Sequence, residues 1–225
     1  MLAAFTAGLL LITVSELGDK TFFIAVILAT RHSRRLVFIG VIAALAAMTI
    51  LSVLMGKVAS LLPAEYIHHA EVGLFLGFGV KLLYDAAKMP AKSEGNEAEE
   101  AAEVVEQASL NLPASGKTMG FVSALGLQSS QMAVMLQAFT LTFLAEWGDR
   151  TQIATITLAA ANNPAGVALG AVLGHSICAA LAVIGGKLIA NRISERMMTT
   201  LGGCLFLIFG IVAAFEGVPK SPHSL

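Results

Sequence analysis

Long apolar stretches of this chain are separated by short polar turns. About 20 apolar residues suffice to cross a bilayer as a helix, and six segments reach that length. They are Leu2–Thr30, Leu36–Leu62, Ala70–Met89, Met132–Ala160, Gly166–Ala190 and Met197–Glu216. The pattern predicts an all-α membrane protein with six transmembrane helices.

Residues 91–130 between the third and fourth segments have a different character. Six glutamates fall within positions 94–106 of this stretch. High charge with few apolar residues favours a solvated tether. We therefore divide the chain into a transmembrane unit at 1–90, an acidic linker, a second transmembrane unit at 131–218 and a tail at 219–225.

Composition supports a membrane location. Of the 225 residues, 56% are hydrophobic and 13% are charged, whereas soluble domains average about 25% charged residues. Mean hydropathy is +0.80. The net charge of −1 carries little information, and we expect no nucleic-acid partner; the lipid bilayer is the expected surrounding.

The two transmembrane units resemble each other at an offset of 130 residues. The stretch Glu16–Thr21 (ELGDKT) falls on Glu146–Thr151 (EWGDRT), and glycines at 40, 56 and 73 fall on those at 170, 186 and 203. Such a register indicates an internal duplication. Because each copy has three spans, the second must be inverted, which is typical of secondary transporters with a midplane substrate site.

Basic residues set the expected orientation. Arg31, Arg34 and Arg35 follow the first span, Arg192 and Arg196 follow the fifth, and further lysines flank the linker. Positive residues favour the cytoplasm. We expect a cytoplasmic linker and both termini outside.

Each copy places charges in the middle of a long span. A charge facing lipid at a helix centre costs about 2.5–3.5 kcal/mol on insertion scales. The six motif charges should therefore face a wet interior. Gly18 and Gly148 beside them are candidate helix breaks.

The spacing gives the motifs a chemical meaning. Glu16 and Asp19 are three residues apart and share a helix face, as do Glu146 and Asp149. We predict that these four carboxylates bind a metal ion where the inverted copies meet. Lys20 and Arg150 would balance the charge, leaving a sum of −2 that one divalent cation or two protons would neutralise. This sum is the basis of an exchanger.

The ligand types narrow the cation. Carboxylates, supplemented by the Thr21 and Thr151 hydroxyls, form an oxygen-only site that suits Ca²⁺, Mn²⁺ or Mg²⁺. Gln152 and His175 are further candidates for an extra ligand or a proton path. The cation is cargo, so no resident cofactor is expected.

A structural alternative treats the motifs as ion pairs between residues four apart, Glu16 with Lys20 and Glu146 with Arg150, that merely pin helices together. It leaves Asp19 and Asp149 without partners. It also gives no reason for a glycine beside the charges in both copies.

These residues resemble a known family. E-x-G-D-[KR]-[TS] in the first and fourth spans of a duplicated six-span protein is similar to the GDT-type family, whose members include Golgi, chloroplast and bacterial or cyanobacterial Mn²⁺/Ca²⁺ transporters. The resemblance covers the chain except the linker. It implies cation binding by the acids of both motifs and proton-coupled export of the metal from the cytosol.

Our preferred hypothesis is thus a Mn²⁺ or Ca²⁺/proton antiporter working by alternating access, in a plasma membrane or, in a cyanobacterium, a thylakoid membrane. An exporter of a small organic solute, such as an amino acid, is an alternative. An intramembrane aspartyl protease is disfavoured, because a fixed base follows each aspartate, and we expect no enzyme. Mn²⁺ and Ca²⁺ both suit such an oxygen site, and the sequence is compatible with a homo-oligomer.

Overall fold

The computed structural model describes residues 1–89, 96–111, 129–190 and 194–217, and all regular structure in these ranges is helical. The helices are α1 (Leu2–Glu16), α2 (Lys20–Arg31), α3 (Arg34–Ala59), α4 (Ala64–Lys88), α5 (Asn96–Asn111), α7 (Ser129–Ala145), α8 (Arg150–Ala161), α9 (Pro164–Ala190) and α10 (Glu195–Glu216). The predicted tail and the linker residues 91–95 and 112–128 lie outside the described residues.

Three of the described helices are long and apolar enough to cross a membrane: α3, the Pro164–Gly186 part of α9, and α10. The apolar helices Leu2–Glu16 and Gln131–Ala145 are shorter, because a break separates each from the helix that follows. α4 carries charged residues such as Glu71 and Asp85 within its length. The fold is thus all-helical and consistent with a membrane protein.

Two glycines break the first and fourth predicted spans. Gly18 has φ 81° and Gly148 has φ 80°, a left-handed conformation that costs other residues about 1–2 kcal/mol. α1 and α2 meet at the first break, and α7 and α8 meet at the second. A Cβ at Gly148 would touch nothing within 4 Å, so the backbone conformation itself calls for glycine.

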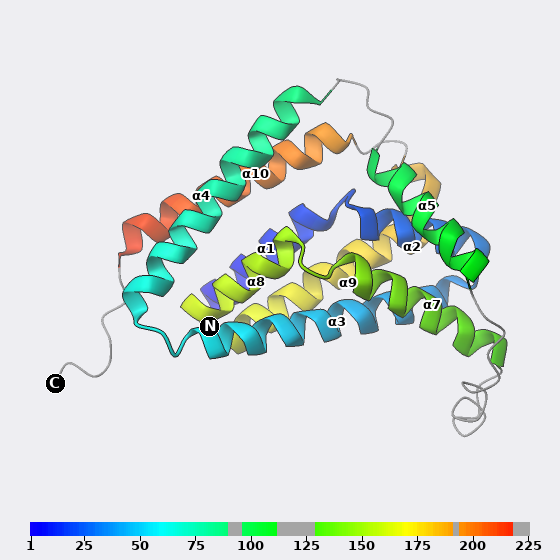
Figure 1. Ribbon diagram of the computed structural model, residues 1–225, viewed down its shortest axis with the longest axis horizontal. Coiled ribbons are helices and arrows are strands. Elements are labelled where there is room, and N and C mark those ends of the chain that lie inside the picture. The colour runs from blue at the N-terminus through cyan, green and yellow to red at the C-terminus, as the bar shows by residue number, and fades with distance from the viewer. Residues whose placement is uncertain (90–95, 112–128, 191–193, 218–225) are drawn as a thin grey trace.

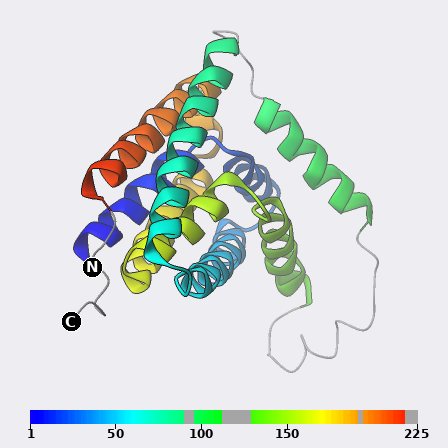
Figure 2. The ribbon, with the colours of Figure 1, turned by 60° about the vertical axis from the view of Figure 1, so that its left-hand side comes forward.

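The helices form a bundle with a separate pair beside it. In the bundle, α1 packs along α9, and α3 contacts α7, α8 and α9. α4 and α10 run antiparallel as the pair, set against one side of the bundle (Figure 1; Figure 2). We call the end that carries α5 and the α2–α3 turn the linker end. The opposite end, with the N-terminus, the last turn of α10 and the α3–α4 and α8–α9 turns, is the termini end (Figure 1).

The acidic linker is not solely a solvated tether, which corrects the expectation from composition. Its helix α5 packs on α2, and Ala101 and Val105, four residues apart, are 0% and 1% exposed. They join a core cluster that includes Phe22 and Phe23 of α2. An apolar seam on an otherwise charged helix explains why α5 docks against the bundle.

Candidate cation site

Both motif backbones turn in the same way. α1 ends at Glu16, Gly18 makes the turn, and Asp19 is the N-cap residue of α2. Glu146 and Gly148 do the same after α7, with Asp149 as the N-cap residue of α8. Each acidic pair therefore sits between the end of one helix and the start of the next, where the free N–H groups of the second helix favour negative charge.

Three carboxylates converge. One oxygen each of Glu16, Asp19 and Glu146 lie within 4.8 Å of one another. Glu16 and Glu146 are each only 2% exposed, and the Oε1 atom of each has no hydrogen-bond partner. Oxygens bound at 2.3–2.6 Å to a Ca²⁺-sized ion lie up to about 5 Å apart across it. The spacing and the two unsatisfied buried oxygens suit a divalent cation.

Threonines link the motifs to these acids. The Thr21 hydroxyl donates to Glu16 Oε2 at 3.2 Å, and the Thr151 hydroxyl lies 3.4 Å from Glu146 Oε2. Thr151 also lies beside Glu16, and Thr21 beside Glu146. The two threonines therefore hold both glutamates in the same small space.

Asp149, the fourth predicted ligand, is engaged elsewhere. Its Oδ1 accepts from the Gln152 backbone N–H at 2.7 Å, and its Oδ2 accepts from the Thr151 hydroxyl at 2.7 Å. These bonds cap α8. The N-cap Asp19 of α2 makes no such capping bond, and one of its oxygens lies in the cluster instead.

The two motif bases also differ in their partners. Arg150 Nη2 donates to Asp19 Oδ1 of the other motif at 3.1 Å, whereas Lys20 Nζ contacts Glu100 Oε2 of α5 at 3.0 Å. Neither pair of residues four apart, Glu16–Lys20 or Glu146–Arg150, forms among the described residues. The pinning role considered for these pairs therefore has no counterpart in the structure.

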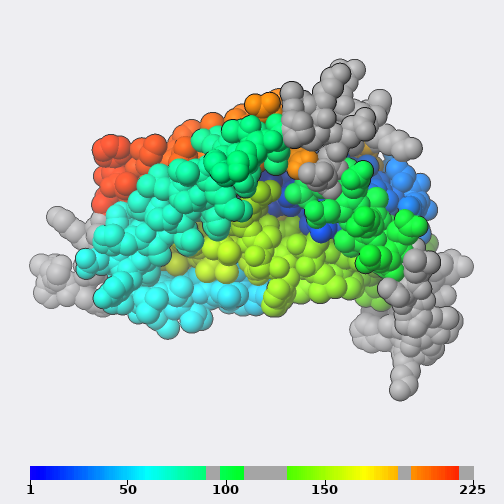
Figure 3. Space-filling model, turned by 45° about the horizontal axis from the view of Figure 1, so that its top comes forward, coloured from blue at the N-terminus to red at the C-terminus, as the bar shows by residue number. Residues whose placement is uncertain are grey.

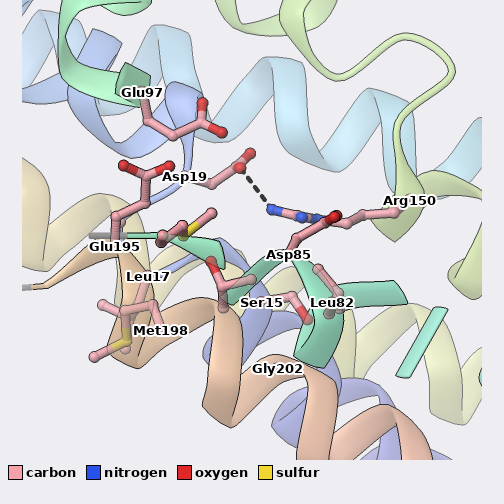
Figure 4. A pocket seen from close by; sticks show the side chains of 13 residues that line it. Ser15, Leu17, Asp19, Leu82, Asp85, Glu97, Arg150, Glu195, Met198 and Gly202 are labelled. Atoms are coloured by element: carbon pink, nitrogen blue, oxygen red, sulfur yellow. Dashed lines mark hydrogen bonds and ion pairs between the residues drawn. The ribbon is translucent and has the colours of Figure 1, made fainter. Parts of the chain in front are cut away.

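A cavity of about 210 Å³ leads from this region toward the linker end. Asp19 and Arg150 line its inner part, and the linker-end turns of α4 and α10 with Asp85 and Glu195 line its sides. Figure 4 shows Asp19, Glu97 and Glu195 turned toward one another, with Arg150 reaching Asp19. In Figure 3, part of the N-terminal chain shows in a recess between α4 and α5.

Gln152 and His175 lie on other sides of the cluster. The Gln152 Oε1 atom accepts from the Gly148 N–H at 2.6 Å and its Nε2 points at Met48 Sδ, so it fastens the helix break. His175 is 5% exposed and shares a cavity of about 10 Å³, roughly one water in size, with Glu16. Its Nδ1 has no partner.

Sequence reasoning missed the acids around the cavity mouth. Sequence reasoning treats Glu97 as one of the linker glutamates, for which a solvated tether is favoured over gathering cations, and it gives Glu195 no role. Burial, together with the Asp19 carboxylate, raises the pKa of Glu97 to about 7. The four-residue spacing of the apolar Ala101 and Val105 is the sequence signal that could have predicted the packing of this helix on the bundle.

Comparison with known proteins identifies the family. A family model described as divalent cation/proton antiporter GDT1 matches residues 4–90 and 134–221. GDT1-like protein sll0615 of Synechocystis sp. is 55% identical over 213 residues, which are 95% of this chain and 97% of that protein. GDT1-like protein 5 of Arabidopsis thaliana is 42% identical over 221 residues, 94% of this chain and 95% of that protein.

A chloroplastic relative is longer. Protein PAM71-homolog, chloroplastic, of Arabidopsis thaliana is 40% identical over 222 residues, which are 96% of this chain and 60% of that protein. No solved structure matches the chain. With both transmembrane units matched and relatives similar over nearly their whole length, the chain belongs to the GDT1 family of divalent cation/proton antiporters, a family of transporters and not of enzymes.

Proposed function

We propose that this protein exports a divalent cation, Mn²⁺ or Ca²⁺, from the cytosol in exchange for protons. The observation that carries the proposal is the cluster of Glu16, Asp19 and Glu146 at the head of the cavity. All its ligands are oxygens, which suits these two ions. Nothing in the cluster resembles the thiolate or imidazole sets that favour zinc or copper.

In the proposed cycle the cation and the protons compete for the same carboxylates. A cation arriving through the cavity displaces protons from Glu16, Asp19 and Glu146, because only the ionised groups ligate metal. Arg150 forms an ion pair with Asp19 when no cation is bound, and this pair breaks when Asp19 ligates the cation. After the protein turns to the other side, external protons displace the metal and neutralise the cluster for the return.

We propose that the six predicted spans form two inverted repeats of three. In each half a broken helix precedes two long ones. The contact between α4 and α10 is also symmetric, because a glycine of each helix faces a leucine of the other. A Cβ at Gly79 would crowd Leu207, and one at Gly210 would crowd Leu76. These pairs correspond at an offset of 131, where Leu74-Phe75-Leu76 matches Leu205-Phe206-Leu207. The last span thus slips by one residue from the offset of 130.

The proposed orientation places the linker end in the cytosol and the termini outside, following the arginines at 31, 34, 35, 192 and 196. The cavity opens at that end, so the described state would face the cytosol. A plasma membrane or a cyanobacterial thylakoid membrane fits this assignment, and relatives occur in a cyanobacterium and in chloroplasts.

Reconstituted liposomes with an internal pH dye test the proposal. Addition of Mn²⁺ or Ca²⁺ outside, in separate runs, should move protons across the membrane, and the relative rates would rank the metals. Asp19→Asn and Glu16→Gln should each abolish the signal, since each removes a ligand that also carries a proton. Glu65→Gln is the matched control, because Glu65 is exposed in the first turn of α4.

Metal uptake without proton movement would overturn the coupling and leave a uniporter. Full exchange in Asp19→Asn would overturn the site. Movement of an amino acid in place of either metal would favour the organic-solute alternative.

A further inference from the structure

The helices divide into two bodies, each locked by glycines. Close backbone contacts join α1 to α9, where a Cβ at Gly8 would lie 2.9 Å from the Val167 carbonyl oxygen, and α3 to α7, where one at Gly40 would lie 2.6 Å from the Met135 carbonyl oxygen. α4 and α10 are locked to each other by Gly79 and Gly210. The glycines of the pair itself, Gly73, Gly77, Gly79, Gly202, Gly203 and Gly210, make no such contact with the bundle, which leaves that boundary free to shift.

The main contacts between the pair and the bundle come from two helices of the bundle. α4 contacts α8 and α10 contacts α1, and both of those helices run from the breaks toward the termini end (Figure 1). The internal repeat would make the contacts of α10 with α2 and of α4 with α7 equivalent to these. In the described part of the chain those two helix pairs do not pack together to a similar extent. At the linker end the cavity of about 210 Å³ separates the two bodies, and at the termini end a cavity of about 190 Å³ lies beside Glu71, between the start of α4 and the end of α8.

The closed end contains a polar contact inside an apolar surface. Phe75 of α4 and Phe206 of α10 are 1% and 0% exposed and pack in a cluster with Ala154 and Leu158 of α8. One turn away, Glu71 is 8% exposed and accepts from Asn162 Nδ2 at 3.2 Å. Asn162 is the C-cap residue of α8, so this bond ties the pair to the bundle.

The repeat does not duplicate this bond. Under the offsets above, Glu71 corresponds to Gly202, which lines the cavity at the linker end, and Asn162 corresponds to His32. Phe75 and Phe206 correspond to each other, so the aromatic contact can serve both states. Only the state closed at the termini end gains a carboxylate–amide bond.

We infer that Glu71 and Asn162 form a latch that holds the termini end closed and biases the resting protein toward the state open at the linker end. Glu71 is a positioning residue: it acts through the α4–α10 pair and does not touch the cation. The inference rests on the proposed alternating access. It makes loading from the linker end the favoured first step of the cycle.

Thiol labelling without metal tests the latch. Ala154→Cys, introduced with Cys178→Ala and Cys204→Ala, reports on the termini end, because Ala154 is 0% exposed there. A membrane-impermeant maleimide applied from the termini side should label it slowly. Asn162→Ala should raise the labelling rate about tenfold, as expected when a buried hydrogen bond is lost from one of two states and its acceptor is left unsatisfied.

Matched variants separate a latch from general loosening. Glu71→Ala should act like Asn162→Ala, and the double variant should add little, because both remove one bond. Glu71→Gln keeps an oxygen that can accept from Asn162 and should label nearly as slowly as the parent. Ser15→Cys, which lines the cavity, should label more slowly from the linker side in Asn162→Ala, the opposite of what partial unfolding would produce.

Unchanged labelling of both reporters in Asn162→Ala would overturn the latch, as would faster labelling of both. If Ala154→Cys does not fold, the Ser15→Cys result alone decides between these outcomes. The proposed function fails separately, if neither Mn²⁺ nor Ca²⁺ moves protons across liposomes that contain the parent protein.

Discussion

The two motifs share their backbone but not their partners. Both turn at a glycine with positive φ and start the next helix with an aspartate. Yet Asp19 lies in the carboxylate cluster and pairs with Arg150, whereas Asp149 caps α8. Lys20, the counterpart of Arg150, reaches out to Glu100 of the linker helix.

This difference shows that two nearly identical motifs can have different contacts in one conformation of the protein. Sequence symmetry treats Asp19 and Asp149 as equal ligands, but packing at one end of the α4–α10 pair makes their surroundings unequal. Under the proposed alternating access the two motifs would exchange roles when the protein turns. The predictions below test that asymmetry.

The largest contrast is expected between Asp19→Asn and Asp149→Asn. Asp19→Asn should weaken Mn²⁺ binding at least about 100-fold, because losing a ligand should exceed the roughly 10–100-fold cost of losing a ligand's supporting partner. Asp149→Asn should bind within about tenfold of the parent, because Asn caps helices as well as Asp does. Both variants should lose exchange. Mn²⁺ titration followed by electron paramagnetic resonance, alongside the liposome assay, measures the two properties.

Equal loss of binding in both variants would contradict the asymmetry, since it would make Asp149 a ligand in the described state. Thr155→Ser on the same helix α8 is a suitable control for handling and folding, because it keeps the hydroxyl.

Replacing the two motif bases, Arg150 and Lys20, should lower the free energy of unfolding by different amounts, and this contrast is smaller than that between the aspartates. Arg150→Gln should lower the free energy of unfolding by about 2–3 kcal/mol, somewhat less than the 3–5 kcal/mol typical when a fully buried pair is broken. Lys20→Gln should cost about 0–1 kcal/mol, because Glu100 is largely exposed. Chemical denaturation in detergent micelles measures both, with Lys81→Gln on α4 as a surface control. A larger cost for Lys20 would reverse the assignment of partners.

The smallest effect concerns the pH dependence of α5 docking. The pKa of Glu97 rises from 4.5 to about 7 when α5 is docked, because of burial and the nearby Asp19. The docked state therefore binds the proton more tightly. Docking weakens as pH rises from about 4.5 to 7 and changes no further above that.

Spin labels on α5 and α2 would follow this change as a distance distribution between pH 5 and 8. Glu97→Gln should flatten the dependence, while Glu103→Gln, whose side chain is exposed, should leave it in place. A dependence that survives Glu97→Gln would assign the titration to another group.

Much of the framework follows from sequence. The apolar segments predict the long helices, and glycine beside charges predicts the breaks at Gly18 and Gly148. The convergence of Glu16, Asp19 and Glu146 follows from the internal duplication. These features are local or repeat along the chain, so a single sequence contains them.

The remainder depends on tertiary packing. The cap made by Asp149 could have been suggested by an aspartate preceding Thr151 and Gln152 at a helix start, but the same signal would apply to Asp19. Glu71 is an acid in an apolar helix, and its partner Asn162 lies 91 positions away in the sequence, so only tertiary packing brings the two together. Which copy's aspartate joins the carboxylate cluster and which copy's aspartate caps its helix is a property of one conformation, and symmetric motifs do not encode it.

The central claim is that Glu16, Asp19 and Glu146 hold the transported cation. Anomalous diffraction from crystals grown with Mn²⁺ tests it most directly. The account predicts a single strong peak between these three carboxylates, and its loss in Asp19→Asn. A peak among Asp85, Glu97 and Glu195 at the cavity mouth, with none at the cluster, would contradict it.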